Sequence, residues 1–409
     1  MSEGRGAGNR MRGLILAALL TIMGVGIAWL SIRAALVRAL PPASANVVAI
    51  APHDPGTVLA RASDALVRQR GILAPATLAA VRGAAAAAPL DARAYLVLGH
   101  QQLLDGEGMR AVRTLEAGQR LDPRQRLIHL LLLDRYIRTG RYSDAAGQFS
   151  VLARLMGPTQ GPIATAMAAM ALAPETRGAV RRTLLADPRL ERGVLIALAR
   201  SDTDPAAIFA LATPAAIADA GSKESWGPVL ITRLVERGRF AAAREIWRRI
   251  YQIPAADAAA PIFDARFAGP SASPPFDWTL VASGLGVADI RRGSLVVNYY
   301  GRESGELASQ LLVLPPGRYR FTVIVDPGKP SDAARLNWTL ACATGDKAEL
   351  LTLPVTAGAT RRRLATAFDV SANCPAQMLL LRGEASEFPT TVNLTLRRPD
   401  ITKLPEKTR

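Results

Sequence analysis

The sequence predicts three kinds of structure in succession: a single N-terminal transmembrane helix, an all-α region and an all-β antiparallel sandwich. An apolar run without charge lies near the N-terminus, from Gly13 to Ile32. Segments rich in alanine and leucine, broken by glycine, proline and aspartate, continue to about Tyr251. From about residue 276 onward, apolar and polar residues alternate in short segments, as they do in half-buried strands. The fold class is therefore multi-domain, helical first and then β.

The apolar run is long enough to cross a membrane. At about 1.5 Å per residue it reaches about 30 Å, the thickness of a bilayer's hydrocarbon core. We expect a cytoplasmic tail at 1–12, a transmembrane helix at 13–36 and an extended tether at 37–55. A cleaved signal peptide is the alternative, because Ala43-Ser44-Ala45 has the small-x-small form of a cleavage site. The run exceeds the roughly 7–15 residues of a signal peptide's apolar stretch, which favours the anchor.

The composition indicates a bacterial protein with a folded bulk. Hydrophobic residues make up 49% of the 409 residues, which leaves ample material for cores once the anchor is set aside. The net charge is +16, and almost all of the basic residues are arginine, as in proteins of GC-rich genomes. They form neither a continuous basic helix nor a patch interleaved with aromatic residues, so we expect no nucleic-acid partner.

The two cysteines, Cys342 and Cys374, both lie in the last third of the chain. Beyond a membrane such a pair predicts a disulfide, because oxidising compartments favour that bond. We therefore expect the bulk of the chain to lie in the periplasm of a bacterial inner membrane, with the N-terminus in the cytoplasm. The three histidines fall into no ligand spacing with each other or with the cysteines. No metal and no cofactor are expected.

Several positions of the helical region recur about every 34 residues. A turn glycine also recurs at a fixed distance ahead of an alanine and a large apolar residue, at Gly106, Gly140 and Gly238. On these positions the region 56–251 resembles the tetratricopeptide repeat family. The residues expected to pack within and between the repeats are Tyr95, Leu98, Gly99, Ala111, Leu115, Pro123, Tyr136, Ala145, Phe149, Ala243 and Trp247.

The resemblance implies a right-handed solenoid of paired helices that binds a protein partner. In such a solenoid small residues let the two helices of a repeat approach closely, and aromatic residues fill the spaces between repeats. Between residues 160 and 236 several prolines break the pattern into short helices, and the sequence assigns no repeat register there. A helical bundle without repeats is the alternative.

Residues 252–275 are rich in proline, glycine and small residues and are expected to link two domains. A sandwich domain at 276–402 follows, with a tail at 403–409, and a strand at 263–267 would start the sandwich from about 262. Alternation predicts further strands, and Cys342 would end one of them while Cys374 precedes another. The clearest of these segments are 295–300, 310–314, 318–325, 336–342, 376–381 and 392–396.

The order of landmarks in this domain resembles that of jelly-roll carbohydrate-binding modules. The resemblance rests on Trp278, Gln310, Gly317 and Tyr319. It implies glycan binding, in which an exposed aromatic ring stacks on a sugar and polar groups bind the hydroxyls. The candidate contacts are Trp278, Tyr300 and Asn298. Packing in the core is the competing role for both aromatic residues, and Tyr319 and Trp338 lie in phase with core positions.

We find no catalytic motif in the sequence. Asp277, Asp289, Glu303 and Glu306 could supply paired carboxylates for glycoside cleavage, but their spacing singles out no pair. The leading hypothesis is a non-enzymatic, membrane-anchored scaffold that assists exopolysaccharide or envelope assembly. It binds a protein and possesses a sandwich suited to a polysaccharide. One alternative is an assembly factor that binds a partner peptide and no glycan, and another is an enzyme that acts on glycans.

Overall fold

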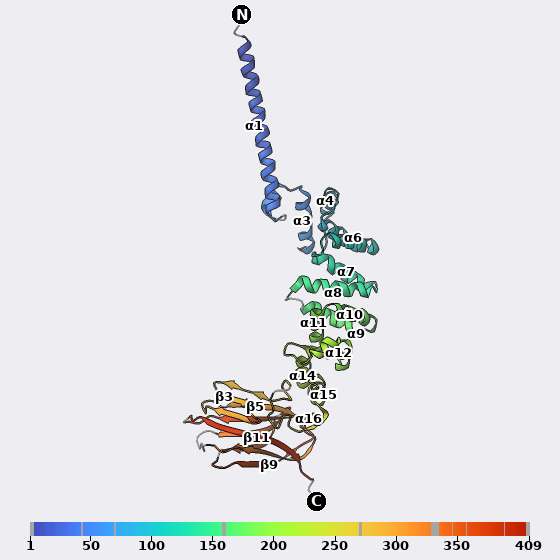
Figure 1. Cartoon of the computed structure of the whole chain (residues 1–409). Coiled ribbons are helices and arrows are strands. Elements are labelled where there is room, and N and C mark those ends of the chain that lie inside the picture. Colours follow the sequence, from blue (N-terminus) through green and yellow to red (C-terminus); the bar gives the residue numbers. More distant parts are fainter. Residues whose placement is uncertain are drawn as a thin grey trace. The chain divides into compact units, whose positions relative to one another are not determined.

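The computed structural model describes residues 4–41, 44–68, 71–157, 161–269, 272–328, 335–345, 347–356, 358–387 and 389–405. Helices occupy the chain as far as residue 259 and strands follow from residue 279, which is the fold class the sequence predicts (Figure 1). Internal contacts divide the chain into two compact units. One comprises Met1–Ile163 with Gly178–Thr183, and the other comprises Ala164–Arg177 with Leu184–Arg409.

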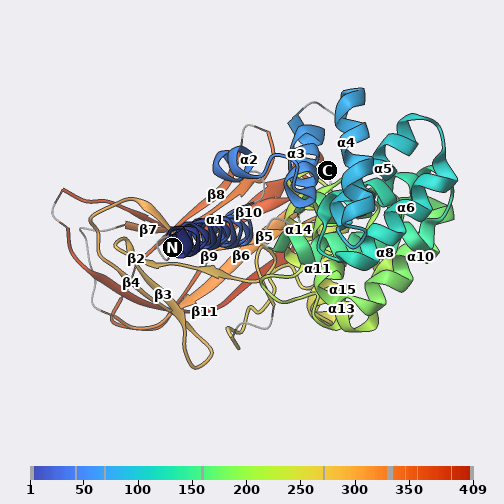
Figure 2. The same ribbon diagram turned by 90° about the horizontal axis from the view of Figure 1, so that it is seen from above.

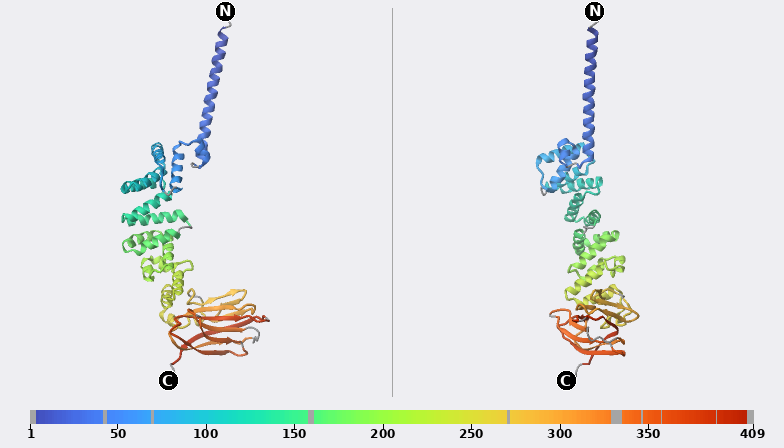
Figure 3. Two further views of the ribbon diagram at one scale, coloured as in Figure 1. Left: turned by 180° about the vertical axis from the view of Figure 1, so that it is seen from behind. Right: turned by 90° about the vertical axis from the view of Figure 1, so that its left-hand side faces the viewer.

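The chain begins with the long helix α1, Gly4–Ala39, which Figure 2 shows end-on and Figure 3 shows from two sides. Its window Leu19–Leu36 has a mean hydropathy of 1.8, and none of the window is buried. No other helix in the described ranges is long and apolar enough to cross a membrane. A signal sequence would pass the same test, and Ala43 of the alternative cleavage site lies outside the described residues.

The segment predicted as an extended tether contains a short helix, α2, at Ala45–Ile50. The hydroxyl of Ser44 accepts a hydrogen bond from the amide of Val47 and so caps this helix. Val47 is fully buried. The composition did not predict this helix, because proline and small residues precede it and a single serine is its only start signal.

Six further helices of the first unit follow one another with short connections. They are α3 (Pro55–Arg68), α4 (Pro75–Ala87), α5 (Ala92–Leu104), α6 (Gly108–Leu121), α7 (Arg126–Arg138) and α8 (Tyr142–Met156). Acidic residues begin two of them: the carboxylate of Asp54 accepts from the amide of Thr57, and that of Asp91 accepts from the amide of Arg93. Neighbouring helices pack together in sequence order, as expected of paired helices.

The glycines that recur in the sequence end the first helix of a pair in the same way each time. Gly106, Gly140 and Gly238 have φ angles of 79°, 71° and 69°, a region that side chains disfavour. The next residue returns a hydrogen bond to the helix, as Arg141 N does to Tyr136 O at 2.9 Å and Arg239 N to Leu234 O at 2.8 Å. This is the Schellman arrangement, which satisfies the carbonyls at a helix end.

Small residues bring the helices of a pair together. A Cβ atom on Gly99 would lie only 2.6 Å from Cγ of Leu115, so α5 and α6 can approach this closely only because residue 99 is glycine. The expected packing residues Ala111, Leu115, Tyr136, Ala145, Phe149, Ala243 and Trp247 are all at most 3% exposed. Tyr95 and Leu98 are half-buried, and Pro123 is exposed with its carbonyl oxygen next to His129.

Most of the region 160–236, where the sequence assigned no repeat register, lies in the second unit and is helical. It contains α11 (Pro188–Arg200), α12 (Pro205–Leu211), α13 (Pro214–Ala218), α14 (Trp226–Glu236), α15 (Phe240–Ile250) and α16 (Ala255–Ala259). Three of these helices start with proline directly after a capping residue, Asp187, Asp204 or Thr213. The prolines that obscured the repeat pattern are thus helix starts. Helices α9 (Gly161–Leu172) and α10 (Pro174–Ala186) contribute residues to both units.

The strands form two antiparallel sheets, seen as two layers in Figure 3. The five-stranded sheet has the order β1-β5-β10-β7-β8 and the six-stranded sheet β2-β3-β4-β11-β6-β9. The strands are β1 (Thr279–Leu280), β2 (Ala282–Ser283), β3 (Gly286–Ile290), β4 (Leu295–Tyr299), β5 (Gly305–Leu312), β6 (Gly317–Val325), β7 (Arg335–Cys342), β8 (Glu349–Val355), β9 (Arg362–Val370), β10 (Gln377–Glu384) and β11 (Val392–Lys403). Apolar side chains from both sheets, such as Val297, Phe321 and Trp338, form the core between them.

One expectation about the start of this domain is wrong. Residues 263–266 form a turn rather than a strand, and both Asp264 and Phe267 have positive φ. Residues 252–275, predicted to link two domains, hold α16 and several buried apolar side chains, among them Ile262 and Phe263, so this segment is packed. Composition missed this because proline and glycine occur in packed turns as well as in linkers.

Candidate binding sites

The sandwich places the expected glycan residues in two different environments. Trp278 is only 7% exposed and its ring packs against Phe267 and Trp338, with ring centres 5.4 and 6.0 Å away. Its Nε1 donates to the carbonyl of Asp264 at 3.3 Å. Because an exposed ring is needed to stack on a sugar, Trp278 is a core residue, which corrects the expectation that it contacts glycan.

Asn298 and Tyr300 lie on the outer side of the six-stranded sheet. In β4 the residues Leu295, Val297 and Tyr299 are fully buried, so their neighbours point away from the core. Tyr300 continues the ladder, since its amide donates to the carbonyl of Leu285 at 3.2 Å. Both Asn298 and Tyr300 are half-buried.

The neighbouring strand adds a second amide to this surface. Asn393 of β11 lies directly opposite Asn298 in the ladder and is exposed. No side-chain hydrogen bond of either amide is found within the described part of the chain. We call Asn298, Tyr300 and Asn393 the outer amide face. Residues directly opposite in a ladder share a face, but Asn393 was missed in the sequence because the pairing of β4 with β11 joins segments far apart in the chain.

The other residues behind the carbohydrate-module resemblance have structural positions. Gln310 is 1% exposed, and its amide exchanges two hydrogen bonds with the backbone of Phe263, at 3.1 and 2.9 Å. Gly317 has a φ of 151°, and Tyr319 is 4% exposed with its hydroxyl donating to Pro315 O. Gln310 thus ties β5 to the segment at Phe263, and Tyr319 fixes the turn that leads into β6.

Two of the four acidic side chains considered for glycoside cleavage are engaged in other contacts. The carboxylate of Asp277 is buried and accepts from the amides of Ala272 and Trp278. Asp289 pairs with Arg291 at 2.7 Å on the surface. Within the residues that the structure describes, no group of three or more His, Cys, Asp or Glu side chains is arranged to hold a metal ion.

A surface pocket of about 360 Å³ lies between α6 and the end of α7 in the first unit. We call it the Arg135 pocket. It is lined by Gly108, Met109, Val112, Arg113, Glu116, Arg135, Thr139 and Arg141. The pocket forms between the second helix of one pair and the first helix of the next, so no short stretch of sequence indicates it.

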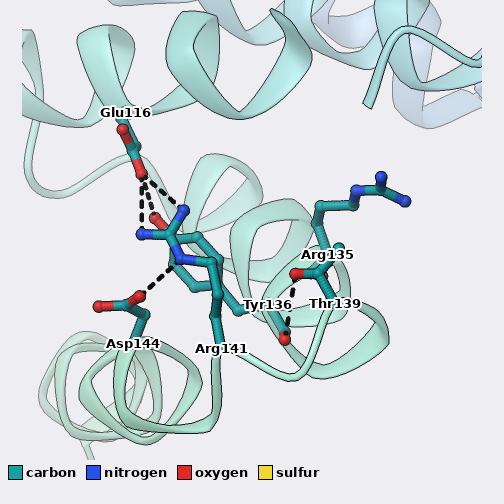
Figure 4. A network of polar contacts seen from close by, with 6 residues as sticks. All are labelled: Glu116, Arg135, Tyr136, Thr139, Arg141 and Asp144. Atoms are coloured by element: carbon teal, nitrogen blue, oxygen red, sulfur yellow. Dashed lines mark hydrogen bonds and ion pairs between the residues drawn. The ribbon is translucent and has the colours of Figure 1, made fainter. Parts of the chain in front are cut away.

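One wall of this pocket is a polar network, drawn in Figure 4. The Tyr136 hydroxyl donates to Glu116 Oε1 at 2.8 Å, and the Arg141 guanidinium approaches the same oxygen at 3.4 Å. Arg141 also lies over the Tyr136 ring, 4.3 Å from its centre, and pairs with Asp144 at 2.7 Å. Burial, with the Glu116 hydrogen bond adding to it, raises the pKa of Tyr136 well above its ordinary value.

Arg135 joins this network only through its backbone carbonyl, which accepts from the Thr139 hydroxyl at 2.8 Å. Figure 4 shows its guanidinium directed away from Glu116 and Arg141. Its Nε is buried and has no hydrogen-bond partner in the described residues. The guanidinium lies against Gly108, where a Cβ atom would come within 2.1 Å of Nη2. Gly108 therefore leaves room for the Arg135 guanidinium, and no described residue accepts a hydrogen bond from its Nε.

The junction between the last helix pair and the sandwich lies wholly within the second unit. Trp247 of α15 packs edge-on against Phe263 and Phe276, with ring centres 4.9 and 5.7 Å away, and its Nε1 donates to Ser273 O at 2.8 Å. Arg244, one turn earlier, donates to the carbonyls of Ala258 and Ala260. Trp247 was expected to pack between repeats, and it also contacts the segment that enters the sandwich.

The expected disulfide is confirmed. Cys342 at the end of β7 and Cys374 just before β10 are bonded, with their Cα atoms 5.5 Å apart. The closed loop contains β8 and β9, which are the last strands of the two different sheets. The disulfide therefore joins the end of β7 to the start of β10, two strands that are neighbours in the five-stranded sheet.

No protein-family model matches the chain, and no curated protein matches it. Solved structures similar to parts of it include the N-terminal cellulose-binding domain of Cellulomonas fimi β-1,4-glucanase C, at 14% identity and a TM-score of 0.26, over 36% of this chain and 99% of that one. Another is YrrB, a TPR protein with an unusual peptide-binding site, at 16% identity and a TM-score of 0.24, over 42% of this chain and 91% of that one. A third is the enzymatically active domain of bacteriophage CBA120 tailspike protein 4, at 8% identity and a TM-score of 0.26, over 36% of this chain and 22% of that one.

Proposed function

We propose that this chain is a non-enzymatic, membrane-anchored binding protein of the bacterial inner membrane. Its helices bind a protein partner, and its sandwich binds a polysaccharide outside the cytoplasm, in support of polysaccharide or cell-envelope assembly. The apolar window of α1 supports the anchor. The Cys342–Cys374 disulfide supports a bulk on the oxidising side of the membrane.

The observation that carries the glycan part is the outer amide face. A half-buried tyrosine ring beside two facing amides supplies what a sugar requires: an apolar surface for the ring and groups that both donate and accept hydrogen bonds. Amides without internal partners remain available to hydroxyl groups.

The test is affinity electrophoresis of the full-length protein in detergent, with gels containing either acidic alginate or neutral hydroxyethylcellulose. We expect at least one gel to retard the wild type, and the Tyr300→Ala, Asn298→Ala double variant to weaken binding about tenfold, equivalent to about 1.4 kcal/mol. Tyr142→Ala is the matched control, because Tyr142 is also half-buried but lies at the start of α8.

If the double variant is retarded as strongly as the wild type, the glycan binds elsewhere and the outer amide face is not its site. If neither gel retards the wild type, the proposal that the sandwich binds a glycan is refuted for these two polymers. An assembly factor that binds only protein would then be the better description, because the Arg135 pocket on the helices does not depend on the sandwich.

A further inference from the structure

We propose that the Arg135 pocket is a docking site for an acidic peptide segment of a protein partner, with Arg135 binding a carboxylate and Met109 contacting an adjacent apolar side chain. This inference deepens the protein-binding part of the proposed function and rests on it. It concerns the groove between α6 and α7, which nothing in the sequence singled out.

Arg135 has a buried Nε–H group that donates to no described residue. A buried N–H group without a partner destabilises the folded state, so folded chains rarely leave one. The guanidinium cannot move inward, because it already lies against Gly108. Because Nε itself is buried, an external acceptor would bind the other N–H groups of the same guanidinium, and a carboxylate can accept from two of them at once.

The second argument is the charge balance of the pocket. Three arginines line it, Arg113, Arg135 and Arg141, against the single carboxylate of Glu116. Glu116 Oε1 is already shared between Tyr136 and Arg141, and Arg141 also pairs with Asp144. No ion pair of Arg113 or Arg135 is found within the described part of the chain. Among the residues that the structure describes, two positive charges of the pocket thus have no counter-charge.

The third argument decides between a peptide and an acidic sugar. Met109 is 82% exposed and Val112 is half-buried, and both line the same pocket as Arg135. A flexible, exposed methionine beside an arginine suits an apolar side chain next to an acidic one. A uronate would use the arginine and leave the methionine in water. The observations therefore favour a peptide.

A similar arrangement occurs in the second unit, so the buried arginine is not confined to one helix. Arg233 precedes Gly238 by the same interval by which Arg135 precedes Gly140. Its Nε is also buried without a partner, and it lines a pocket of about 460 Å³ together with Arg200, Pro228 and Val229. Arg233 differs in one respect, because its Nη1 lies 3.3 Å from Glu236.

The experiment measures fluorescence anisotropy of labelled peptides with the full-length protein in detergent micelles. The probe is a short peptide of glutamate and leucine separated by glycine, and it is compared with versions carrying glutamine for glutamate or serine for leucine. We expect the glutamate–leucine peptide to bind tightest. Arg135→Gln should weaken it about ten- to hundredfold, as loss of a charge-assisted hydrogen bond implies.

Two variants test position separately from charge. Gly108→Ala keeps every charge but places a Cβ atom where Nη2 lies, so it should also weaken binding. Arg135→Lys keeps the charge without the planar fork and should show an intermediate loss. Arg120→Gln is the matched control, since Arg120 is exposed on α6 outside the pocket, and it should leave the dissociation constant unchanged. Melting curves followed by circular dichroism confirm that each variant is folded.

Three results would overturn the inference. One is an equal loss in the Arg120 control, which would indicate general charge attraction. Another is tighter binding of alginate than of peptide through Arg135, which would make the ligand a sugar. The third is no binding of any peptide. If crosslinking in membranes still captures a protein through the helices after the third result, the proposed function stands and only this pocket is refuted.

Discussion

The helix pairs α7–α8 and α14–α15 share one design but differ at their outer aromatic residue. Both pairs turn at a glycine with positive φ and bury an alanine, Ala145 or Ala243, at the close contact. The aromatic position holds Phe149 in one pair and Trp247 in the other, and both side chains are buried. Trp247 in addition donates its indole N–H to Ser273 O. The last pair thus uses a larger ring with a polar atom to attach the segment that leads into the sandwich.

Removing the larger ring should have the greatest effect. Trp247→Ala is expected to cost about 3–5 kcal/mol of unfolding free energy, because it empties a fully buried site between three aromatic rings. The loss should extend into the sandwich through Phe263 and Phe276. Urea unfolding gives the free energy, and hydrogen exchange of peptides from residues 253–278 reports the junction.

Phe149→Ala is the control for this prediction. It should cost a similar free energy in the first unit while leaving hydrogen exchange at 253–278 unchanged. If both variants raise exchange there equally, the special role of Trp247 in attaching the sandwich is refuted.

The shared turn should respond equally in both pairs. Gly140→Ala and Gly238→Ala each force a side chain into a left-handed conformation, at about 1–2 kcal/mol. Neither new Cβ atom would meet a close neighbour, since the nearest atom at Gly238 is 3.9 Å away and none lies within 4 Å at Gly140. Thermal melting of the two variants should therefore agree. A much larger effect at Gly238 would mean that the sandwich constrains the last turn.

A smaller effect should distinguish the first pair alone. Tyr136 occupies the position that Leu234 occupies in α14, and only the tyrosine can bond to Glu116. Its raised pKa means that the folded state holds the phenolic proton more tightly than the unfolded state. The resulting stabilisation is complete below the ordinary tyrosine pKa of about 10 and is lost as the pH rises towards the folded pKa.

Tyr136→Phe should therefore cost about 1 kcal/mol at neutral pH and lessen the fall in stability above about pH 10. Urea unfolding of wild type and variant, at neutral pH and above about pH 10, measures the difference in unfolding free energy. The other tyrosines contribute equally to both proteins and cancel in the comparison. An unchanged pH profile would show that this phenol contributes nothing to alkaline unfolding.

The sequence predicted those features that depend on local residues or simple periods. The turn glycines and the alternation around Phe321 are visible in neighbouring residues, and the disulfide could be predicted because the chain has just two cysteines. Contacts across distant segments did not show. Trp278 and Tyr300 look equally available in the sequence, and only the packing of Phe267 and Trp338 decides that one of them is buried. Arg135 is likewise ordinary until the fold sets it against Gly108.

The disulfide has a consequence for self-association. An unpaired edge strand can recruit another chain, and long flat edges carry the greatest risk of aggregation. In the two sheets, the edge strands β1 and β2 have only two residues each, whereas β8 and β9 are longer. Both longer edges lie in the loop that Cys342 and Cys374 close, and β8 carries Pro354, which has no backbone N–H. Tying the loop limits how far these edges can separate, so the crosslink protects against the exchange of strands between copies as well as against unfolding.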